Sequence, residues 1–212
     1  MKKLILPLLL LVAFGMLAAV ESDPSAVVGY VKYDCVAGNN MIALPMEQGF
    51  TLASEVGDYA PASSVGAWNP STELWEVINT FPWGGWDGEF NVTNGQPLLI
   101  SVDAALSFYS IGDLPTTIPS YTLVAGNNTI MVPLNRSDLD LASEVGDAIP
   151  ASSVGAWNAT TELWEVINTF PWGGWDGEFA TAIGDPLLVS VDASGVWPSA
   201  AKNVKIINSN SK

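Results

Sequence analysis

Residues 52–90 read LASEVGDYAPASSVGAWNPSTELWEVINTFPWGGWDGEF, and residues 141–179 repeat them as LASEVGDAIPASSVGAWNATTELWEVINTFPWGGWDGEF. Only four of the 39 aligned positions differ, and these pair Tyr59 with Ala148, Ala60 with Ile149, Pro70 with Ala159 and Ser71 with Thr160. Self-similarity at a fixed spacing is the sequence signature of a repeat architecture. The chain therefore contains two copies of one folding unit.

The duplication extends beyond the quoted stretch. Tyr33 aligns with Tyr121 at an offset of 88 residues and Leu52 with Leu141 at an offset of 89, so one residue is inserted between them. The alignment divides the chain into repeat 1 at 21–110, a proline-containing linker at 111–120, repeat 2 at 121–197 and a polar tail at 198–212. Units of about 90 residues can fold alone, so the repeats could form two domains or one pseudo-symmetric domain. The short linker indicates that they touch.

Residues 1–20 have the pattern of a secretory signal peptide. Two lysines precede an apolar run at 4–17, and small residues at 18–19 mark the expected cleavage site. An uncleaved anchor is the alternative, although the run is short for a membrane span and contains Pro7. We expect the mature protein to be secreted, as an extracellular or cell-surface protein without a membrane segment.

The mature chain is strongly acidic. It keeps 22 acidic residues but only five of the seven basic ones once the two N-terminal lysines are removed, so its net charge moves from −15 to −17. Because phosphate binding needs clustered lysine and arginine, we expect no nucleic-acid partner and no binding to anionic lipid. Three of the five basic residues lie in the tail, and they are Lys202, Lys205 and Lys212. The tail also contains a strand pattern at 204–207.

Each repeat predicts a mainly β module. In repeat 1 a strand is expected at 27–33, ahead of an Ala-Gly-Asn-Asn turn at 37–40. A hairpin follows at 64–78, and its return strand is apolar on both faces, so we expect both faces to be covered. A last strand pair is expected at 89–92 and 98–102.

The LASEV motif predicts one short helix in each repeat. Thr51 or Asp140 can cap its first turn, and Gly57 or Gly146 can end it. Each repeat then holds about five strands and one helix. We therefore expect a mainly β fold, built as a tandem duplication of two sandwich- or barrel-like modules.

The single cysteine can form no disulfide within the chain. Cys35 aligns with Leu123 of the second copy. A position that accepts leucine predicts a buried apolar site for the thiol rather than a reactive one.

The chain carries little catalytic equipment. It has no histidine and one cysteine, which excludes histidine-based triads, histidine-ligated zinc and dithiol chemistry. Only carboxylates remain, and a glycoside hydrolase needs two of them at a set separation. The candidates cluster in sequence and are Glu73, Glu76, Asp87 and Glu89. Acids at hairpin edges are usually solvated, so we expect a protein that is not an enzyme, with a carboxylate glycosidase as the alternative.

Tryptophan is concentrated in the repeats. Trp68, Trp75 and their copies are expected in the hairpin core. The motif WGGWD would instead display its rings on a glycine loop, and an aromatic face beside a short polar side chain is what a sugar-binding site needs. The predicted carbohydrate-binding residues are Trp83, Trp86, Asp87, Trp172, Trp175 and Asp176. The alternative is that this pair also folds back onto the module.

Calcium is the only cofactor that the residues suggest. Carboxylates of an extracellular protein can ligate it, and the candidates are Asp87, Glu89, Asp176 and Glu178. None lies in the spaced acidic loop of an EF-hand, so solvated acids are the alternative interpretation.

The motifs AGNNMIALPM, LASEVGD, SSVGAWNPSTELW and GQPLLISV resemble tandem modules of secreted and surface-exposed bacterial proteins. The resemblance covers nearly the whole mature chain and implies an extracellular or cell-surface role, with no catalytic residues to carry over. The first hypothesis is a secreted structural or adhesive repeat protein that self-assembles at the cell surface or into a filament. The alternative is a carbohydrate-binding protein that uses the tryptophan loop of each repeat.

Overall fold

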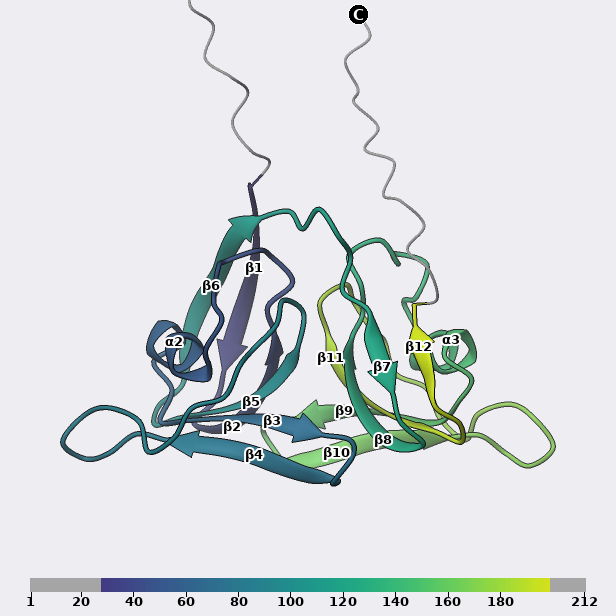
Figure 1. Ribbon diagram of the computed structural model, residues 1–212. Helices are drawn as coiled ribbons and strands as arrows, with labels where there is room; N and C mark the ends of the chain where they lie inside the picture. The colour runs from purple at the N-terminus through teal and green to yellow at the C-terminus, as the bar shows by residue number, and fades with distance from the viewer. Residues whose placement is uncertain (1–27, 199–212) are drawn as a thin grey trace, which may run out of the picture.

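The computed structural model describes residues 28–198 (Figure 1). The predicted signal peptide and the predicted strand at 204–207 lie outside these residues. Module 1 comprises β1 (Val28–Cys35), β2 (Gly38–Ala43), α2 (Ala53–Tyr59), β3 (Ser64–Asn69), β4 (Leu74–Asn79), β5 (Pro97–Val102) and β6 (Leu106–Asp113). Module 2 comprises β7 (Tyr121–Leu123), β8 (Gly126–Met131), α3 (Ala142–Ala148), β9 (Ala151–Asn158), β10 (Leu163–Asn168), β11 (Pro186–Val191) and β12 (Gly195–Trp197).

The predicted mainly β duplication is confirmed. Each module has a four-stranded antiparallel sheet, in the order β2-β5-β3-β4 or β8-β11-β9-β10, and a two-stranded ribbon, β1-β6 or β7-β12. Each module therefore has six strands instead of about five. The additional strand is β6 in module 1, which pairs with β1, and β12 in module 2, which pairs with β7.

The core of each module lies between the inner face of its sheet and its helix. Val65 of β3 pairs with Ile78 of β4 and with Ile100 of β5, and all three side chains are buried. Val56 of α2 packs into the same cluster. Cys35 and Leu123 are both buried, so the apolar environment predicted for the thiol is confirmed, and burial raises the pKa of that thiol.

The predicted turn at 37–40 is also present, and a buried asparagine closes it. Asn40 accepts a hydrogen bond from the backbone N–H of Val36 at 3.0 Å and donates to the carbonyl of Val36 at 2.8 Å. Asn128 makes the equivalent bonds with Val124. The repeated Asn-Asn dipeptide thus supplies the side chain that the turn backbone needs.

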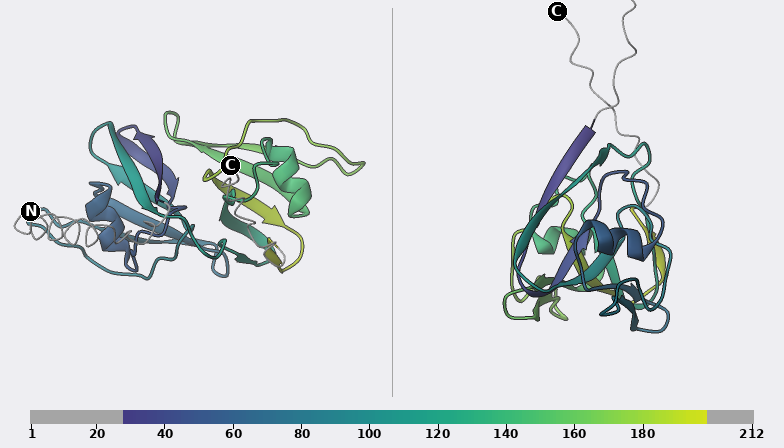
Figure 2. Two further views of the ribbon diagram at one scale, coloured as in Figure 1. Left: turned by 90° about the horizontal axis from the view of Figure 1, so that it is seen from above. Right: turned by 90° about the vertical axis from the view of Figure 1, so that its left-hand side faces the viewer.

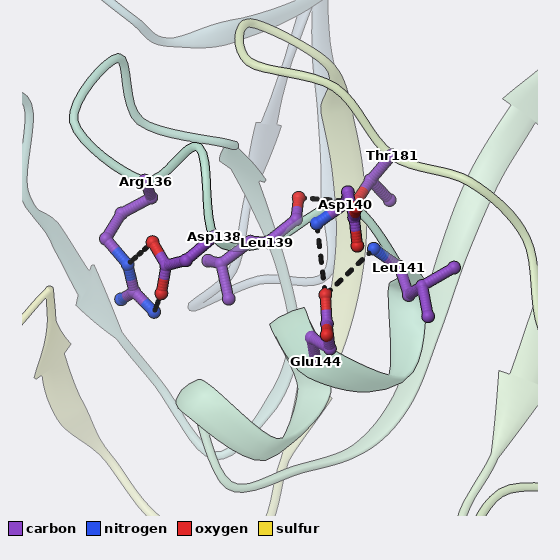
Figure 3. A network of polar contacts seen from close by, with 7 residues as sticks. All are labelled: Arg136, Asp138, Leu139, Asp140, Leu141, Glu144 and Thr181. Carbon is purple, nitrogen blue, oxygen red and sulfur yellow. Dashed lines mark hydrogen bonds and ion pairs between the residues drawn. The ribbon is translucent and has the colours of Figure 1, made fainter.

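The helix caps differ from the prediction. The cap residues are Leu52 and Leu141, and no side chain of Thr51 or Asp140 caps the helix. Figure 3 shows instead that Glu144 accepts bonds from the backbone N–H groups of Asp140 and Leu141, at 3.1 and 3.2 Å. The preceding loop is held by an Arg136–Asp138 ion pair and by the Thr181 hydroxyl, which donates to the carbonyl of Leu139 at 2.9 Å (Figure 3).

Three predicted boundaries are wrong. Gly57 lies inside α2 rather than at its end, because the ring of Trp86 occupies the place that a side chain would fill. Residues 89–92 form only an isolated bridge between Asn91 and Leu52, so β5 pairs with β2 and β3 instead. The linker is shorter than 111–120, since β6 continues to Asp113.

The two modules pack against each other as one pseudo-symmetric body. The indole N–H of Trp68 donates to the carbonyl of Asn127 at 2.8 Å, and the indole N–H of Trp157 donates to the carbonyl of Asn39 at 2.8 Å. Each hairpin therefore reaches the turn of the other module in the same way. Figure 2 shows the modules side by side from above.

This packing corrects the expectation that Trp68 and Trp75 lie in the hairpin core. They form a cross-strand pair on the outer face of the sheet, with ring centroids 5.5 Å apart, and belong to neither buried cluster.

Within residues 28–198, no helix is long and apolar enough to cross a membrane.

Candidate functional site

The loops that follow β4 and β10 project from opposite ends of the body (Figure 1). Phe81 donates its backbone N–H to the carbonyl of Gly85 at 2.9 Å, and Gly84 donates to the carbonyl of Phe81 at 2.9 Å. Gly84 and Gly85 have φ angles of 93° and 84°, a conformation that residues with a side chain rarely adopt. The two glycines therefore fix the loop that carries the tryptophans.

Trp83 is the most exposed large hydrophobic side chain of module 1 among the described residues. It is 81% exposed and stacks on Phe81 with the ring centroids 5.1 Å apart and an interplanar angle of 9°. Trp172 is also 81% exposed and stacks on Phe170 at 5.0 Å and 9°. Each loop thus presents one flat indole face that is supported from behind by a phenyl ring.

Trp86, the second tryptophan of the loop, points into the module. Its ring covers Gly57 so closely that a Cβ added there would lie 2.3 Å from it. Its indole N–H donates to Asp58 at 3.0 Å, and Trp175 donates to Asp147 at 3.1 Å in the same way. The predicted pair therefore divides into one exposed ring and one that anchors the loop to the helix.

The acidic residues of the loop make bonds within the module. Asp87 accepts from the backbone N–H and the side-chain amide of Asn79, at 2.7 and 3.1 Å, and these bonds lower the pKa of its carboxyl. Glu89 accepts from the Ser54 hydroxyl and from its backbone N–H, which lowers the pKa of Glu89. Asp176 and Glu178 of module 2 repeat these contacts with Asn168 and Ser143.

These contacts bear on the two sites predicted from carboxylates. Among residues 28–198, no three histidine, cysteine, aspartate or glutamate side chains are grouped so that they could hold a metal ion. Glu73, one of the glycosidase candidates, lies at the module contact, where a Cβ added to Gly126 would be 2.7 Å from its carboxylate oxygen. Calcium binding and glycoside hydrolysis therefore stay predictions that no arrangement of these side chains favours.

The hairpin leaves more apolar surface uncovered than expected. Leu74 is 65% and Val77 46% exposed, and Leu163 and Val166 are 64% and 44% exposed. The expectation that both faces of this strand are covered is wrong, because β4 and β10 are the outer strands of their sheets. Leu74 lies on the same face of β4 as the buried Ile78, and Val77 lies on the opposite face with Trp75. We call these residues, with Phe81 and Trp83 or with Phe170 and Trp172, the hairpin surface of each module.

A groove of about 500 Å³ lies between the modules, and no motif in the sequence predicts it. It is lined by Trp68 and Gln96 of module 1, by the linker residue Pro119, and by Tyr121 of module 2. The hydroxyl of Tyr121 donates to the carbonyl of Gly95 across the groove at 2.8 Å. Its walls come from three separate segments, so only the packing of the modules creates it.

Comparisons with models of protein families, with curated proteins and with solved structures find no match to this chain. The function must therefore be argued from the geometry of the site itself.

Proposed function

We propose that the protein is a secreted, non-enzymatic structural or adhesive protein that self-associates through the hairpin surface of each module. The observation that carries the proposal is that the same apolar residues remain exposed in both modules, with Trp83 and Trp172 each 81% exposed. Large apolar side chains that gather in exposed places often mark interaction sites. Their repetition in both modules gives one chain two equivalent contacts.

Two contacts on one rigid body favour assembly beyond a dimer. The loops that carry the two equivalent surfaces project from opposite ends of the body (Figure 1), so each copy can contact two others and build an open chain unless the contacts close into a ring. A second contact on the same particle also raises the apparent affinity for a surface that carries repeated partners. A filament and a surface layer are both consistent with this arrangement.

The mature chain, with five basic and 22 acidic residues, has a net charge of −17, which opposes association and makes it dependent on salt. Screening at physiological ionic strength shortens the range of the repulsion to about 8 Å. We therefore expect association to increase with sodium chloride, and calcium to act more strongly than sodium at equal ionic strength.

The test is light scattering behind size exclusion on residues 20–212, in low salt, in high salt, and with calcium or a chelator. The expected result is a species larger than the monomer that grows with salt. The variant Phe81→Ala/Trp83→Ala/Phe170→Ala/Trp172→Ala should reduce this species. A protein that is strictly monomeric in every condition and binds no cell surface would contradict the proposal.

Carbohydrate binding is a second candidate, supported by the exposed indole face of Trp83 on its phenyl support. Stacking of a sugar on such a face is a common mode of recognition. Of the predicted residues, Trp83 and Trp172 would contact the sugar, since Trp86 and Asp87 bond within the module. A glycan screen read by tryptophan fluorescence tests it, with Trp83→Ala/Trp172→Ala as the variant. No fluorescence change with any glycan would refute this candidate.

A further inference from the structure

The outer edges of β4 and β10 are open for pairing. Thr80 donates its backbone N–H to the carbonyl of Ser63 at 2.9 Å, whereas Asn79 donates in the opposite direction, to Asp87. Backbone groups alternate in direction along an antiparallel strand. The N–H and C=O groups of Trp75 and Val77 therefore point away from β3.

Module 2 has the same open edge. Thr169 donates to the carbonyl of Ser152 at 3.0 Å, and Asn168 donates to Asp176 at 2.6 Å. The free groups are accordingly those of Trp164 and Val166. Among the described residues 28–198, no element pairs with the outer edge of β4 or β10 along these residues.

The charge on the edge opposes pairing between two such edges. An antiparallel pairing that used all the free groups of two β4 strands would place Trp75 opposite Val77 and Glu76 opposite the Glu76 of the second copy. Like charges directly opposite each other are destabilising. Because β10 has the same sequence, Glu165 has the same effect there. The strand that fits this edge must instead bring a cation opposite the glutamate.

We propose that residues 203–207 of a second copy add to β4 or β10 as an antiparallel strand. These residues lie outside the described part of the chain and read NVKII. With Lys205 opposite Glu76, Val204 falls opposite Val77 and Ile206 opposite Trp75. The same register places Ile207 opposite Leu74 and Lys202 opposite Asn79, beside the carboxylate of Asp87.

This register satisfies both the backbone and the side chains. Val204 and Ile206 each exchange two hydrogen bonds with the free groups of Val77 and Trp75. The β-branched side chains cover the exposed parts of Val77 and Leu74, as in other cases where an extended peptide extends a sheet. Residues 199–212 contain three lysines and no acid, whereas the chain as a whole contains 22 acids. The charges of segment and edge are therefore complementary.

The position of β12 favours a second copy over the same chain. Trp197 pairs with Tyr121, at the start of β7, while β7 ends next to β8 at the base of the module. Figure 1 shows that β12 runs away from the base, where β4 and β10 lie. The end of β12, after which the segment follows in the sequence, therefore lies away from both edges. Each chain then has one donor segment and two acceptor edges.

This inference rests on the proposed self-association and is tested by charge reversal in the full mature chain. Lys205→Glu should raise the protein concentration at half-assembly by about tenfold or more, since like charges facing each other at an interface cost several kcal/mol. Glu76→Lys/Glu165→Lys should have the same effect, and the triple variant Lys205→Glu/Glu76→Lys/Glu165→Lys should restore assembly. Lys212→Glu makes the same charge change outside the register and is the matched control. Thermal melting checks that each variant is folded.

The outcomes separate the two proposals. Assembly of the wild type that Lys205→Glu does not change would overturn the strand addition and leave self-association intact. A wild type that is monomeric in every condition would overturn both. The wild type could also be monomeric while Lys205→Glu, but not Lys212→Glu, lowers the melting temperature. That result would mean that the segment binds its own chain, and it would also overturn addition to a second copy.

Discussion

The two ribbons are the part of the molecule where the copies differ most. β1 and β6 pair over eight residues, from Val28 with Asp113 to Cys35 with Leu106. β7 and β12 pair over three, from Tyr121 with Trp197 to Leu123 with Gly195. The stretches 52–90 and 141–179 fold alike, so the difference comes from the residues that flank them.

Prolines account for the shorter ribbon. Pro119 lies two residues before Tyr121 and Pro198 directly follows Trp197, so both stand where the second ribbon would have to continue. A proline has no N–H to donate to the ladder and is found at strand ends. In module 1 the corresponding residues pair freely, and the longer ribbon places Tyr30 against Tyr109, with the ring centroids 6.1 Å apart.

One of the four substitutions within the repeat follows this difference. Tyr59 donates its hydroxyl to the carbonyl of Tyr109 in the extended ribbon and contacts the ring of Phe108 with centroids 6.2 Å apart. Ala148 stands at the same place in module 2, where the ribbon has already ended. The larger side chain is present only where the extra ribbon gives it a partner.

The largest expected effect comes from the buried aromatic residue of each ribbon. Trp197→Ala and Phe108→Ala should each lower the free energy of unfolding by about 3–5 kcal/mol, because each leaves a cavity in its core. In the three-residue ribbon, Trp197→Ala should also release β12, whereas β6 should stay paired in Phe108→Ala. Chemical denaturation gives the energies, and amide exchange at Thr122 and Ser107 reports the pairing. Equal protection of the two amides would contradict the comparison.

A site where the copies agree should respond equally. Gly57→Ala and Gly146→Ala should each cost about 1–3 kcal/mol, because the added methyl overlaps a tightly packed ring. The added Cβ would lie 2.3 Å from the ring of Trp86 in module 1 and 2.2 Å from the ring of Trp175 in module 2. Denaturant unfolding measures both variants. The double variant Gly57→Ala/Trp86→Leu is the control, and its cost should be less than the sum of the single costs.

Tyr59→Ala makes copy 1 resemble copy 2 and should cost about 1–2 kcal/mol, from a lost hydrogen bond and lost ring contacts. Ala148→Tyr should not give a comparable gain, since β12 ends at Trp197, before the position equivalent to Tyr109. Tyr59→Phe separates the two contributions, because it removes only the hydroxyl. Thermal or chemical unfolding measures the free energy of unfolding of each variant. A gain in stability from Ala148→Tyr as large as the loss from Tyr59→Ala would show that this substitution does not depend on ribbon length.

The smallest effect concerns pH and should again be the same in both modules. The carboxyl pKa values of Asp87 and Asp176 lie below the ordinary 3.8, because the N–H groups of Asn79 and Asn168 stabilise the ionised form. This contribution to stability is complete above pH 3.8 and is lost as the pH falls through the lowered folded-state pKa. Carboxyl carbon NMR titration measures it. Asn79→Ala should raise the pKa of Asp87 and leave that of Asp176 unchanged.

The sequence predicted the local parts of the fold well. The hairpin at 64–78 and the Ala-Gly-Asn-Asn turn lie where expected, because both depend on neighbours in the chain. The position of Trp68 was predicted wrongly, since its partner, Asn127, belongs to the other module. Gly57 was placed at the helix end because glycine usually ends a helix, and only the packing of Trp86 explains it inside. In the candidate site, sequence identified the tryptophan loop but not which ring is exposed.

The reciprocal hydrogen bonds between the modules have the symmetry of a contact between two identical subunits. Trp68 and Asn39 both belong to module 1, and their equivalents Trp157 and Asn127 both belong to module 2. A single module therefore carries both halves of the contact and could make it with an identical partner across a true twofold axis. Joining the two copies through the short segment 114–120 makes this association intramolecular, so it does not depend on the protein concentration. The duplicated chain is, in this sense, a symmetric dimer that no longer depends on dilution.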